Sequence, residues 1–283
     1  MLWLVAVIIA TFLSGLGTVL HRYVTKEEDV PSYSFLFTLI AGLFFIPLLF
    51  TERTRLPSGY EWIPFLMAAF LWFLINVVGF TAAKYTQASL KAPLSNVKVL
   101  FLFILAVLFL HEEATVERIA GTIFIFLGAF LLTWRKGSFA HLREFGVQLT
   151  VLTALLTALV TMLDKYNMLL GFSRNFYGAA MYLVPCFFHG IRVLRRKSHL
   201  KKILRNKGWF VLLSGITYGL LYYLYLFAYS FPEAPISVIY PISQLNLIVA
   251  VVLAWIWLGE KAQLERRAAA SVLMVVGAIL VAI

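Results

Sequence analysis

The chain alternates between long apolar runs and short polar clusters, and the lengths of the runs predict its elements. A helix that crosses the ~30 Å hydrocarbon layer of a bilayer needs about 20 apolar residues. Ten runs meet this requirement, and the breaks between them carry charged and turn-forming residues. The runs are residues 2–24, 32–50, 61–82, 88–110, 115–134, 146–165, 175–194, 209–230, 236–258 and 264–283. We therefore predict an all-α integral membrane protein with ten transmembrane helices.

The fourth and ninth runs repeat one another. Pro93, which opens the fourth run, lies 148 residues (241 − 93) before Pro241 of the ninth run. The carboxylates that follow the two runs, Glu112 and Glu260, are separated by the same offset. The same proline-opened helix therefore occurs twice in the chain. We predict that the segments around it are also repeated, as two copies of a larger unit.

Each copy holds five of the predicted spans, in residues 1–137 and residues 138–283. Because five is odd, the second copy must enter the bilayer from the opposite side, which gives two inverted five-helix repeats. Secondary transporters of this arrangement place their binding site near the midplane, between the repeats. The alternative is a duplicated structural bundle that transports nothing.

Composition indicates that the chain lies in a bilayer rather than in water. Hydrophobic residues make up 62% of the chain and charged residues 13%, with a mean hydropathy of +0.90, whereas a soluble domain is about half apolar and a quarter charged. The net charge of +11 does not indicate nucleic acid, because no basic stripe lies on a soluble fold. We attribute the charge to loops that face anionic lipid, above all the basic loop 192–207. Cys186 is the only cysteine, which excludes a disulfide framework and a thiolate metal site.

The repeated frame resembles the EamA-like family of the drug/metabolite transporter superfamily. The resemblance covers essentially the whole chain and rests on two five-span halves, each with a proline-opened fourth helix and a glutamate just past its end. Leu258-Gly259-Glu260 matches the Gly-Glu turn of the family, whereas His111-Glu112 lacks the glycine. The resemblance implies export or exchange of amino acids or other small organic metabolites. We expect a multi-pass protein of the cytoplasmic membrane that works by alternating access, as a monomer or homodimer, without a cofactor or metal.

Lys98 is the most unusual residue of the fourth run, because a lysine near a helix centre costs ~2.5–3.5 kcal/mol to insert. Ser95 shares its helix face, and the repeat puts Ser243 and Asn246 at the corresponding positions. We expect these faces to meet in a cavity lined by the first, third, fourth, sixth, eighth and ninth spans, where Lys98 attracts the anionic end of a substrate. Alternatively, Lys98 reaches the membrane interface or pairs with Asp164.

Three amides, those of Asn76, Asn96 and Gln244, lie inside apolar runs. They are candidates for substrate binding, although interhelical hydrogen bonds worth ~0.6–2 kcal/mol are the commoner use of such groups. Tyr222 belongs to a tyrosine stripe on one face of the eighth span, which either lines the cavity or packs against a neighbouring helix. The stripe consists of Tyr218, Tyr222, Tyr225 and Tyr229.

Three carboxylates lie near the ends of spans. Asp164, near the end of the sixth span, is the candidate for coupling transport to protons or another cation. The alternative for Asp164 is a helix-end charge at the lipid headgroups. Glu112 and Glu260 lie in short turns, where a capping role is favoured over transport chemistry.

Small residues in the fifth and tenth spans predict close helix contacts. Gly121 and Gly128 are seven residues apart, and so are Ala270 and Gly277. Because small residues let helix backbones approach closely, we expect these two spans to brace their halves.

The chain lacks the motifs of an ATP-driven pump or of an enzyme. No Gly-rich loop ends in Lys-Ser or Lys-Thr, so ATP does not drive the protein directly. No spacing of nucleophile and base, or of metal ligands, stands out, which argues against an intramembrane enzyme. A lipid or lipid-head-group flippase is the closer alternative, and it would have a side opening with basic residues at its rim.

The distribution of lysine and arginine predicts the orientation. Of the 24 such residues, 18 fall in loops on the side away from the termini, five fall on the terminal side and Lys98 lies within a span. The positive-inside rule then puts both termini outside the cell. The resemblance implies the reverse, with both termini inside. We follow the count, because it rests on the sequence itself and inverted halves work in either orientation.

Overall fold

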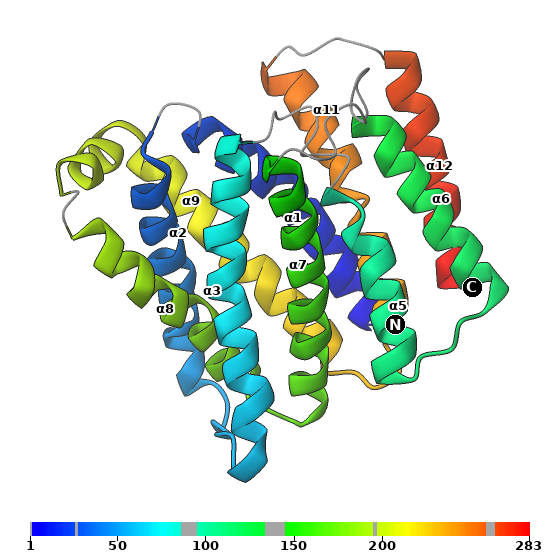
Figure 1. The fold of residues 1–283 in the computed structure, drawn as a ribbon, viewed down its shortest axis with the longest axis horizontal. Coiled ribbons are helices and arrows are strands. Elements are labelled where there is room, and N and C mark those ends of the chain that lie inside the picture. The colour runs from blue at the N-terminus through cyan, green and yellow to red at the C-terminus, as the bar shows by residue number, and fades with distance from the viewer. Residues whose placement is uncertain (1, 26–27, 86–94, 134–144, 195–196, 259–263) are drawn as a thin grey trace.

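The computed structural model describes residues 2–25, 28–85, 95–133, 145–194, 197–258 and 264–283, and every regular element in these ranges is a helix (Figure 1). The all-α fold is confirmed, and each predicted run coincides with helical residues. The α-helices are α1 (Leu2–Thr25), α2 (Val30–Phe45), α3 (Trp62–Tyr85), α5 (Lys98–Leu110), α6 (Val116–Thr133), α7 (Phe145–Leu169), α8 (Arg174–Val193), α9 (Lys197–Tyr229), α10 (Ile236–Ser243), α11 (Asn246–Leu258) and α12 (Leu264–Ala282). Two short 3₁₀ helices, η1 (Pro47–Phe50) and η2 (Gly59–Glu61), follow α2 and precede α3.

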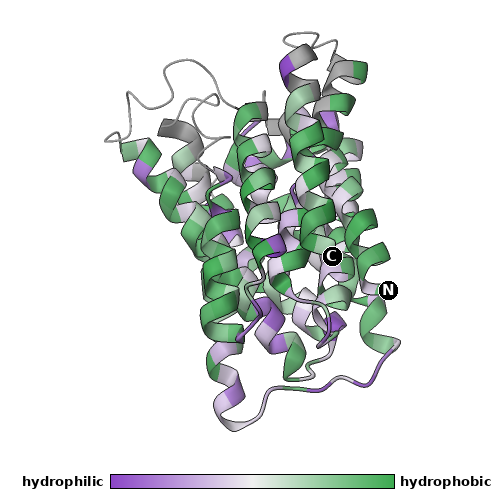
Figure 2. Ribbon diagram, turned by 90° about the vertical axis from the view of Figure 1, so that its right-hand side faces the viewer, coloured by the Kyte–Doolittle hydropathy of each residue, from purple (hydrophilic) through white to green (hydrophobic). Residues whose placement is uncertain are grey.

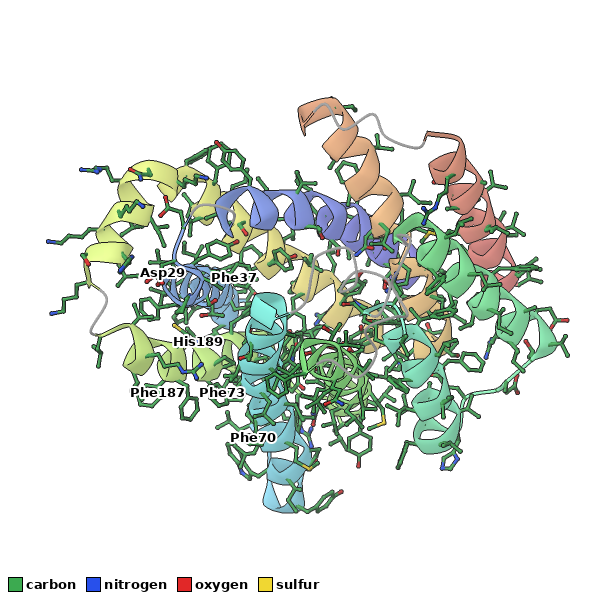
Figure 3. All side chains as sticks on the ribbon, turned by 45° about the horizontal axis from the view of Figure 1, so that its top comes forward. Asp29, Phe37, Phe70, Phe73, Phe187 and His189 are labelled. Carbon is green, nitrogen blue, oxygen red and sulfur yellow. The ribbon has the colours of Figure 1, made fainter. Side chains whose placement is uncertain are left out.

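The outer surface of the bundle is apolar. Figure 2 shows hydrophobic residues along most of the bundle, with hydrophilic residues mainly at helix ends and in loops. Phe70 and Phe187, both labelled in Figure 3, are 58% and 67% exposed. Within the described ranges, five helical segments are long and apolar enough to cross a membrane. They are Leu2–Leu20, Val30–Phe50, Gly59–Gly79, Phe145–Leu169 and Lys197–Tyr229.

The predicted fourth and ninth helices are not continuous. The ninth run folds as α10 and α11, which a turn at Gln244 and Leu245 separates. In the fourth run, Asn96 and Val97 form the corresponding turn, after which α5 begins; residues 86–94 lie outside the described ranges. Pro241 lies inside α10 and has no N–H to donate, which weakens the helix just before the turn. The expectation of single, unbroken spans was therefore wrong at both positions.

The backbone hydrogen bonds at the two turns are the same. The amide of Val99 donates to the carbonyl of Asn96 at 3.1 Å, and the amide of Leu247 donates to the carbonyl of Gln244 at 3.0 Å. Both bonds span three residues instead of the four of an α-helix. The offset of 148 residues found in the sequence therefore describes a repeated break, and broken helices are typical of transporters at membrane depth.

Helix packing relates the two halves of the chain. α1 packs on α9. In the repeat α7 corresponds to α1 and α3 corresponds to α9, and these two helices also pack together. The pair α1–α11 likewise has its counterpart in α7–α5, while α2–α8 and α6–α12 each join equivalent helices. This pairing is the pattern of a two-fold relation between halves. It supports the predicted inverted repeat, although the opposite orientation of the halves stays a prediction.

The predicted small residues bring α6 and α12 into close contact. A Cβ atom added at Gly277 would lie 2.6 Å from the carbonyl oxygen of Gly121, and one added at Gly128 would lie 2.8 Å from that of Ala270. The expectation of close approach was right. However, α6 and α12 come from different halves, so the contact joins the halves instead of bracing each one separately.

We expect Gly277→Ala to lower the unfolding midpoint of the purified protein, because the new methyl group forces α6 and α12 apart. Overpacking of this kind costs ~1–3 kcal/mol. Gly208→Ala is the matched control, since nothing lies within 4 Å of its added Cβ atom. The control should keep or raise the midpoint, because alanine favours a helix over glycine. Equal midpoints for the two variants would argue against the close contact.

Candidate functional site

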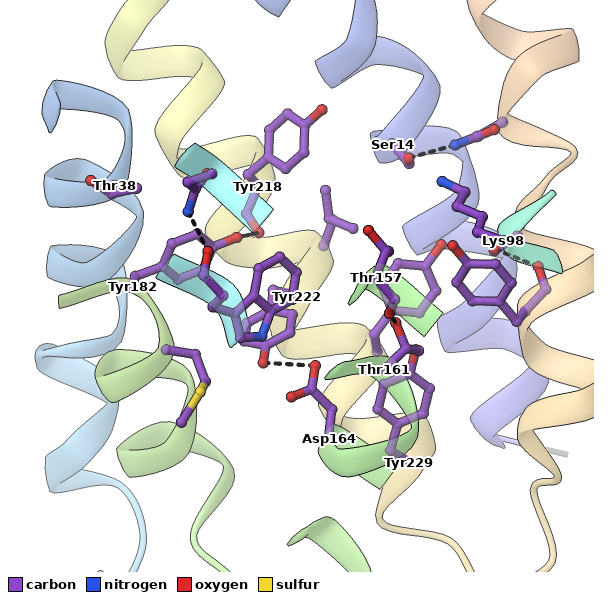
Figure 4. Close-up of a pocket in the computed structure, with 18 of the residues that line it drawn as sticks. Ser14, Thr38, Lys98, Thr157, Thr161, Asp164, Tyr182, Tyr218, Tyr222 and Tyr229 are labelled. Atoms are coloured by element: carbon purple, nitrogen blue, oxygen red, sulfur yellow. Dashed lines mark hydrogen bonds between the residues drawn. The ribbon is translucent and has the colours of Figure 1, made fainter. Parts of the chain in front are cut away.

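A cavity of about 310 Å³ lies between the two halves of the bundle (Figure 4). The six spans expected from the sequence all contribute to its wall, through α1, α3, α5, α7, α9 and the broken pair α10–α11. Two further helices, α2 and α8, also contribute, which the sequence analysis did not anticipate. The cavity therefore draws on both halves of the chain.

Most of the side chains singled out from the sequence line this cavity. They are Asn76, Lys98, Asp164, Tyr222, Ser243, Gln244 and Asn246. The two exceptions, Ser95 and Asn96, are not among the lining residues in the described ranges, and Asn96 is buried at 3% exposure in the turn before α5. Whether the lining residues bind a substrate stays a prediction.

Lys98 is the first residue of α5 and lines the cavity. Its ammonium lies 5.7 Å from the centroid of the Tyr240 ring, which is a cation–π distance. Within the described ranges no acidic side chain pairs with it, and Asp164 lies on a different side of the cavity (Figure 4). The alternative of an ion pair between Lys98 and Asp164 is therefore not what the structure contains. The positive end of the α5 dipole adds to the lysine charge at this point.

The second helix break supplies neutral polar groups. Asn246, which the repeat pairs with Lys98, donates from Nδ2 to the hydroxyl of Ser14 at 2.8 Å. Its Oδ1 atom is buried and has no hydrogen-bond partner in the described part of the chain. Gln244 donates from Nε2 to the hydroxyl of Ser243 at 3.4 Å. The cavity-lining groups of the two breaks therefore differ: the first break contributes the charge of Lys98 and the second contributes the amides of Gln244 and Asn246.

Asp164 is 1% exposed and lies inside the bundle. It accepts hydrogen bonds from the hydroxyls of Tyr177 at 2.7 Å and Tyr222 at 3.1 Å (Figure 4 draws the second). This burial among tyrosines favours a place in the cavity wall over the alternative of a helix-end charge at the headgroups. In the described ranges no basic side chain bonds to it, so the groups that donate to this carboxylate are neutral.

Aromatic rings fill much of the remaining wall. All four members of the tyrosine stripe on α9 line the cavity, so the stripe has the lining role that the sequence left open. Trp72 packs edge-on against Tyr222, with 5.7 Å between the ring centroids. Asn76 donates to the carbonyl of Trp72 on its own helix at 2.9 Å, so its amide does not link two helices here.

Several wall residues were not predicted from the sequence. Tyr240 lies directly before Pro241, where an aromatic residue in an apolar run gives no sign that it lines a cavity. Ser14 and Thr157 are 143 residues apart (157 − 14), and both line the cavity. That offset is close to the repeat spacing, so a search for polar repeat mates would have found the pair.

Glu112 connects the two halves of the chain. Its carboxylate accepts hydrogen bonds from the backbone amides of Ile236 at 2.6 Å and Ser237 at 2.8 Å, which are the first residues of α10. The predicted capping role is therefore right, but the capped helix belongs to the other half of the chain. Nearby, Lys165 is 2% exposed and donates to the carbonyl of Phe231 at 2.6 Å. Glu260 lies outside the described ranges.

We expect Glu112→Gln to destabilise the protein and slow transport, because a glutamine has one acceptor oxygen for two amide donors. Leaving a buried donor without a partner costs ~1–3 kcal/mol. The matched control is Glu113→Gln, the same change at an exposed neighbour. The unfolding midpoint and the initial transport rate of both variants would be measured side by side. If both behave alike, the cap on α10 has no part in stability or transport.

A bundle of membrane-length helices around a polar cavity, with two broken helices at its wall, has the architecture of a secondary transporter. The model of the EamA-like transporter family matches residues 1–134 and again residues 144–283, and the chain belongs to this family. It is therefore a multi-pass membrane protein of the drug/metabolite transporter superfamily. Members of this family are transporters rather than enzymes.

The individual relatives give more information about the fold of this chain than about its substrate. A WAT1-related protein of Arabidopsis thaliana is 28% identical over 137 residues, which cover 45% of this chain and 38% of that protein. The match therefore spans well under half of the relative's length. A protein of solved crystal structure has a TM-score of 0.82 at 15% identity, covering 100% of this chain and 98% of the other. At that identity the likeness shows the fold alone.

Proposed function

We propose that this protein carries a small amino acid-like solute across the cytoplasmic membrane by alternating access, in export or exchange. The observation that supports this most is the placement of Lys98, which has no acidic partner within the described ranges, at the start of α5 in a tyrosine-lined cavity. A solute with a carboxylate and an ammonium group complements that arrangement. The cavity volume of about 310 Å³ also suits a small solute, since it is at the low end of ligand pockets.

In this proposal the two ends of the solute meet different surroundings. The carboxylate meets the ammonium of Lys98 at the start of α5, where the helix dipole also favours negative charge. The amides of Gln244 and Asn246 offer hydrogen bonds from the opposite break. The tyrosine rings provide apolar surface and a favourable environment for a cation. Binding at the two breaks would let the solute influence both halves at once.

Asp164 is the proposed coupling residue. Its carboxylate is buried, and Tyr177 and Tyr222 hold it in place with hydrogen bonds. A buried carboxylate without a cationic partner in the described ranges has a strong preference for a proton or another cation. Such an acid within a membrane bundle is by default a candidate for ion coupling.

The proposed domains are residues 1–137 and 138–283, which would move against each other during transport. The paired helix contacts and the repeated helix break support this division. The turns at Asn96 and Gln244 are the natural hinge points, because their backbone already departs from the α-helix.

Counterflow into liposomes would test the proposed function. Vesicles with the purified protein would be loaded with one unlabelled solute, and uptake of its labelled form would be followed for zwitterionic, anionic and cationic solutes of similar size. We expect exchange of zwitterionic amino acids to exceed that of singly charged analogues. No exchange of any solute, together with movement of a fluorescent phospholipid, would favour the flippase alternative.

We also propose that the loop 192–207 faces the cytoplasm and anionic headgroups, with both termini outside. A cysteine introduced by Lys201→Cys into a Cys186→Ser background should escape a membrane-impermeant maleimide on intact cells and react after permeabilisation. Arg53→Cys is the control from the opposite side, and it should react on intact cells. Both positions are exposed, so access depends only on the side of the membrane. The opposite labelling pattern would show that the charge count is misleading.

A further inference from the structure

An apolar groove of about 370 Å³ lies on the outer surface between α2, α8 and the start of α9. It shares no lining residue with the central cavity. Its wall includes Phe35 from α2, and Phe187, Gly190 and Ile191 from α8. Phe187 lies on the outer side of α8 (Figure 3). The polar side chain at its rim is Lys197, the first residue of α9.

Residues 197–206 form a basic, amphipathic segment beside this groove. A kink at Lys207, with φ of −137° and ψ of 18°, separates it from the rest of α9, and Figure 1 shows it at the edge of the bundle. Lys207 donates to the carbonyl of Tyr23 at 2.9 Å and lies 4.4 Å from the centroid of that ring, which holds the kink. Ile203 is fully buried against the bundle. The basic side chains of the segment are all exposed: Lys197, Lys201, Lys202 and Arg205.

These two features together describe an interfacial site. An amphipathic helix with an apolar face on the protein and basic side chains outward lies at the headgroup level of a bilayer. The groove runs along α8 from this level, beside Leu194 and Ile191, toward Phe187 and Cys186. A concave apolar surface that faces hydrocarbon has no polar groups to hold water, so an acyl chain is its natural occupant. The lysines select a negative headgroup, as basic pockets between transmembrane helices do.

We propose that this groove binds one acyl chain of an anionic phospholipid, whose phosphate lies against Lys197 and Lys201. The two lysines are four residues apart and share a face of the segment. This site deepens the proposed contact of the basic loop with anionic lipid and does not depend on which solute is carried. Its lipid would contact α2 and α8, whose other residues line the central cavity.

Photo-crosslinking in vesicles tests the site. The full-length protein would be reconstituted with a phosphatidylglycerol that carries a diazirine on its acyl chain, or with the matching phosphatidylcholine. We expect crosslinks on peptides that contain residues 186–194 and 197–200, at least about fivefold stronger for phosphatidylglycerol. Unlabelled phosphatidylglycerol should compete for these crosslinks. Equal crosslinking by the two lipids, or crosslinks spread evenly around the bundle, would overturn the proposal.

Two matched double variants distinguish a specific lipid site at Lys197 and Lys201 from general attraction of anionic lipid to the basic segment. Lys197→Gln/Lys201→Gln should reduce the crosslinks about 30-fold, at ~1 kcal/mol for each basic residue near the surface. Lys202→Gln/Arg205→Gln removes the same charge from a different face of the segment and should reduce them much less. Equal losses in the two variants would show electrostatic attraction alone and contradict the site.

A third variant tests the groove without any change of charge. Gly190→Leu places a side chain in the groove, with its Cβ atom 3.2 Å from the ring of Phe35. It should abolish crosslinking at residues 186–194 in protein that still folds, as a cooperative unfolding transition would show. Undiminished crosslinking there by a folded Gly190→Leu protein would overturn the acyl-chain assignment even if the lysines matter.

Discussion

Lys98→Ala is expected to abolish transport while the protein reaches the membrane in normal amounts. The ammonium of Lys98 faces the cavity and has only the Tyr240 ring as a partner within the described ranges. Loss of a hydrogen bond to a charged group costs ~1.5–3 kcal/mol, which corresponds to about 10–100-fold in affinity for an anionic end. The initial rate and the KM of uptake would be measured with abundance determined by immunoblot.

Two further variants make this result specific. Lys98→Arg keeps the charge but has a larger, planar head, so it should impair transport less than the alanine variant does. Lys202→Ala removes an exposed lysine far from the cavity wall and should leave transport unchanged. Normal transport by Lys98→Ala would refute the proposed role. Loss of abundance instead of activity would mean that Lys98 serves the fold.

Asp164→Asn is expected to remove the dependence of uptake on a pH gradient, while solute exchange without a gradient continues. Asparagine has nearly the same shape and still offers an oxygen to Tyr177 or Tyr222, so the bundle should stay folded. It cannot take up a proton, and gradient-driven uptake should therefore fall about tenfold or more, to the rate of exchange. Vesicles with an imposed pH difference measure both rates in one preparation.

The same vesicles distinguish a proton from the ammonium of the solute. If Asp164 binds the ammonium, the asparagine variant also loses exchange of zwitterionic solutes. A pH gradient then does not restore their uptake. Glu113→Gln, an equal change at an exposed site, should alter neither rate. A wild-type protein that never responds to a pH gradient would be a facilitator or exchanger, and the coupling role would be wrong.

The sequence predicted the helices well, because hydrophobic length alone decides whether a segment crosses a bilayer. It did not predict the breaks at Asn96 and Gln244, since two turn residues inside an apolar run barely change its hydropathy. The sequence does contain a feature that marks these breaks. Pro241 and the polar residues that follow it coincide with the turn, and the repeat carries the same pattern into the fourth run.

The candidate site was predicted in part. Polar residues inside apolar runs proved to line the cavity, because a polar group in a membrane bundle is placed where it meets other polar groups. The surroundings of Asp164 were misjudged, since the following Lys165-Tyr166 looked like a helix end, whereas α7 continues to Leu169. The partners of Glu112 are 124 and 125 residues away, and no local pattern reports a contact of that range.

The hydrogen bonds from α10 to Glu112 also affect the equilibrium between the conformations of the protein. Two hydrogen bonds to a carboxylate, each worth ~1.5–3 kcal/mol, favour the form that contains them by a hundredfold or more, roughly, unless other contacts offset them. A solute that binds the other form must overcome this bias, so its apparent affinity is reduced by the fraction of protein in that form. If the second form lacks the cap, two hydrogen bonds that no solute touches set the resting balance of this carrier. Two transporters with identical cavity walls would differ in apparent affinity if only one of them had this carboxylate.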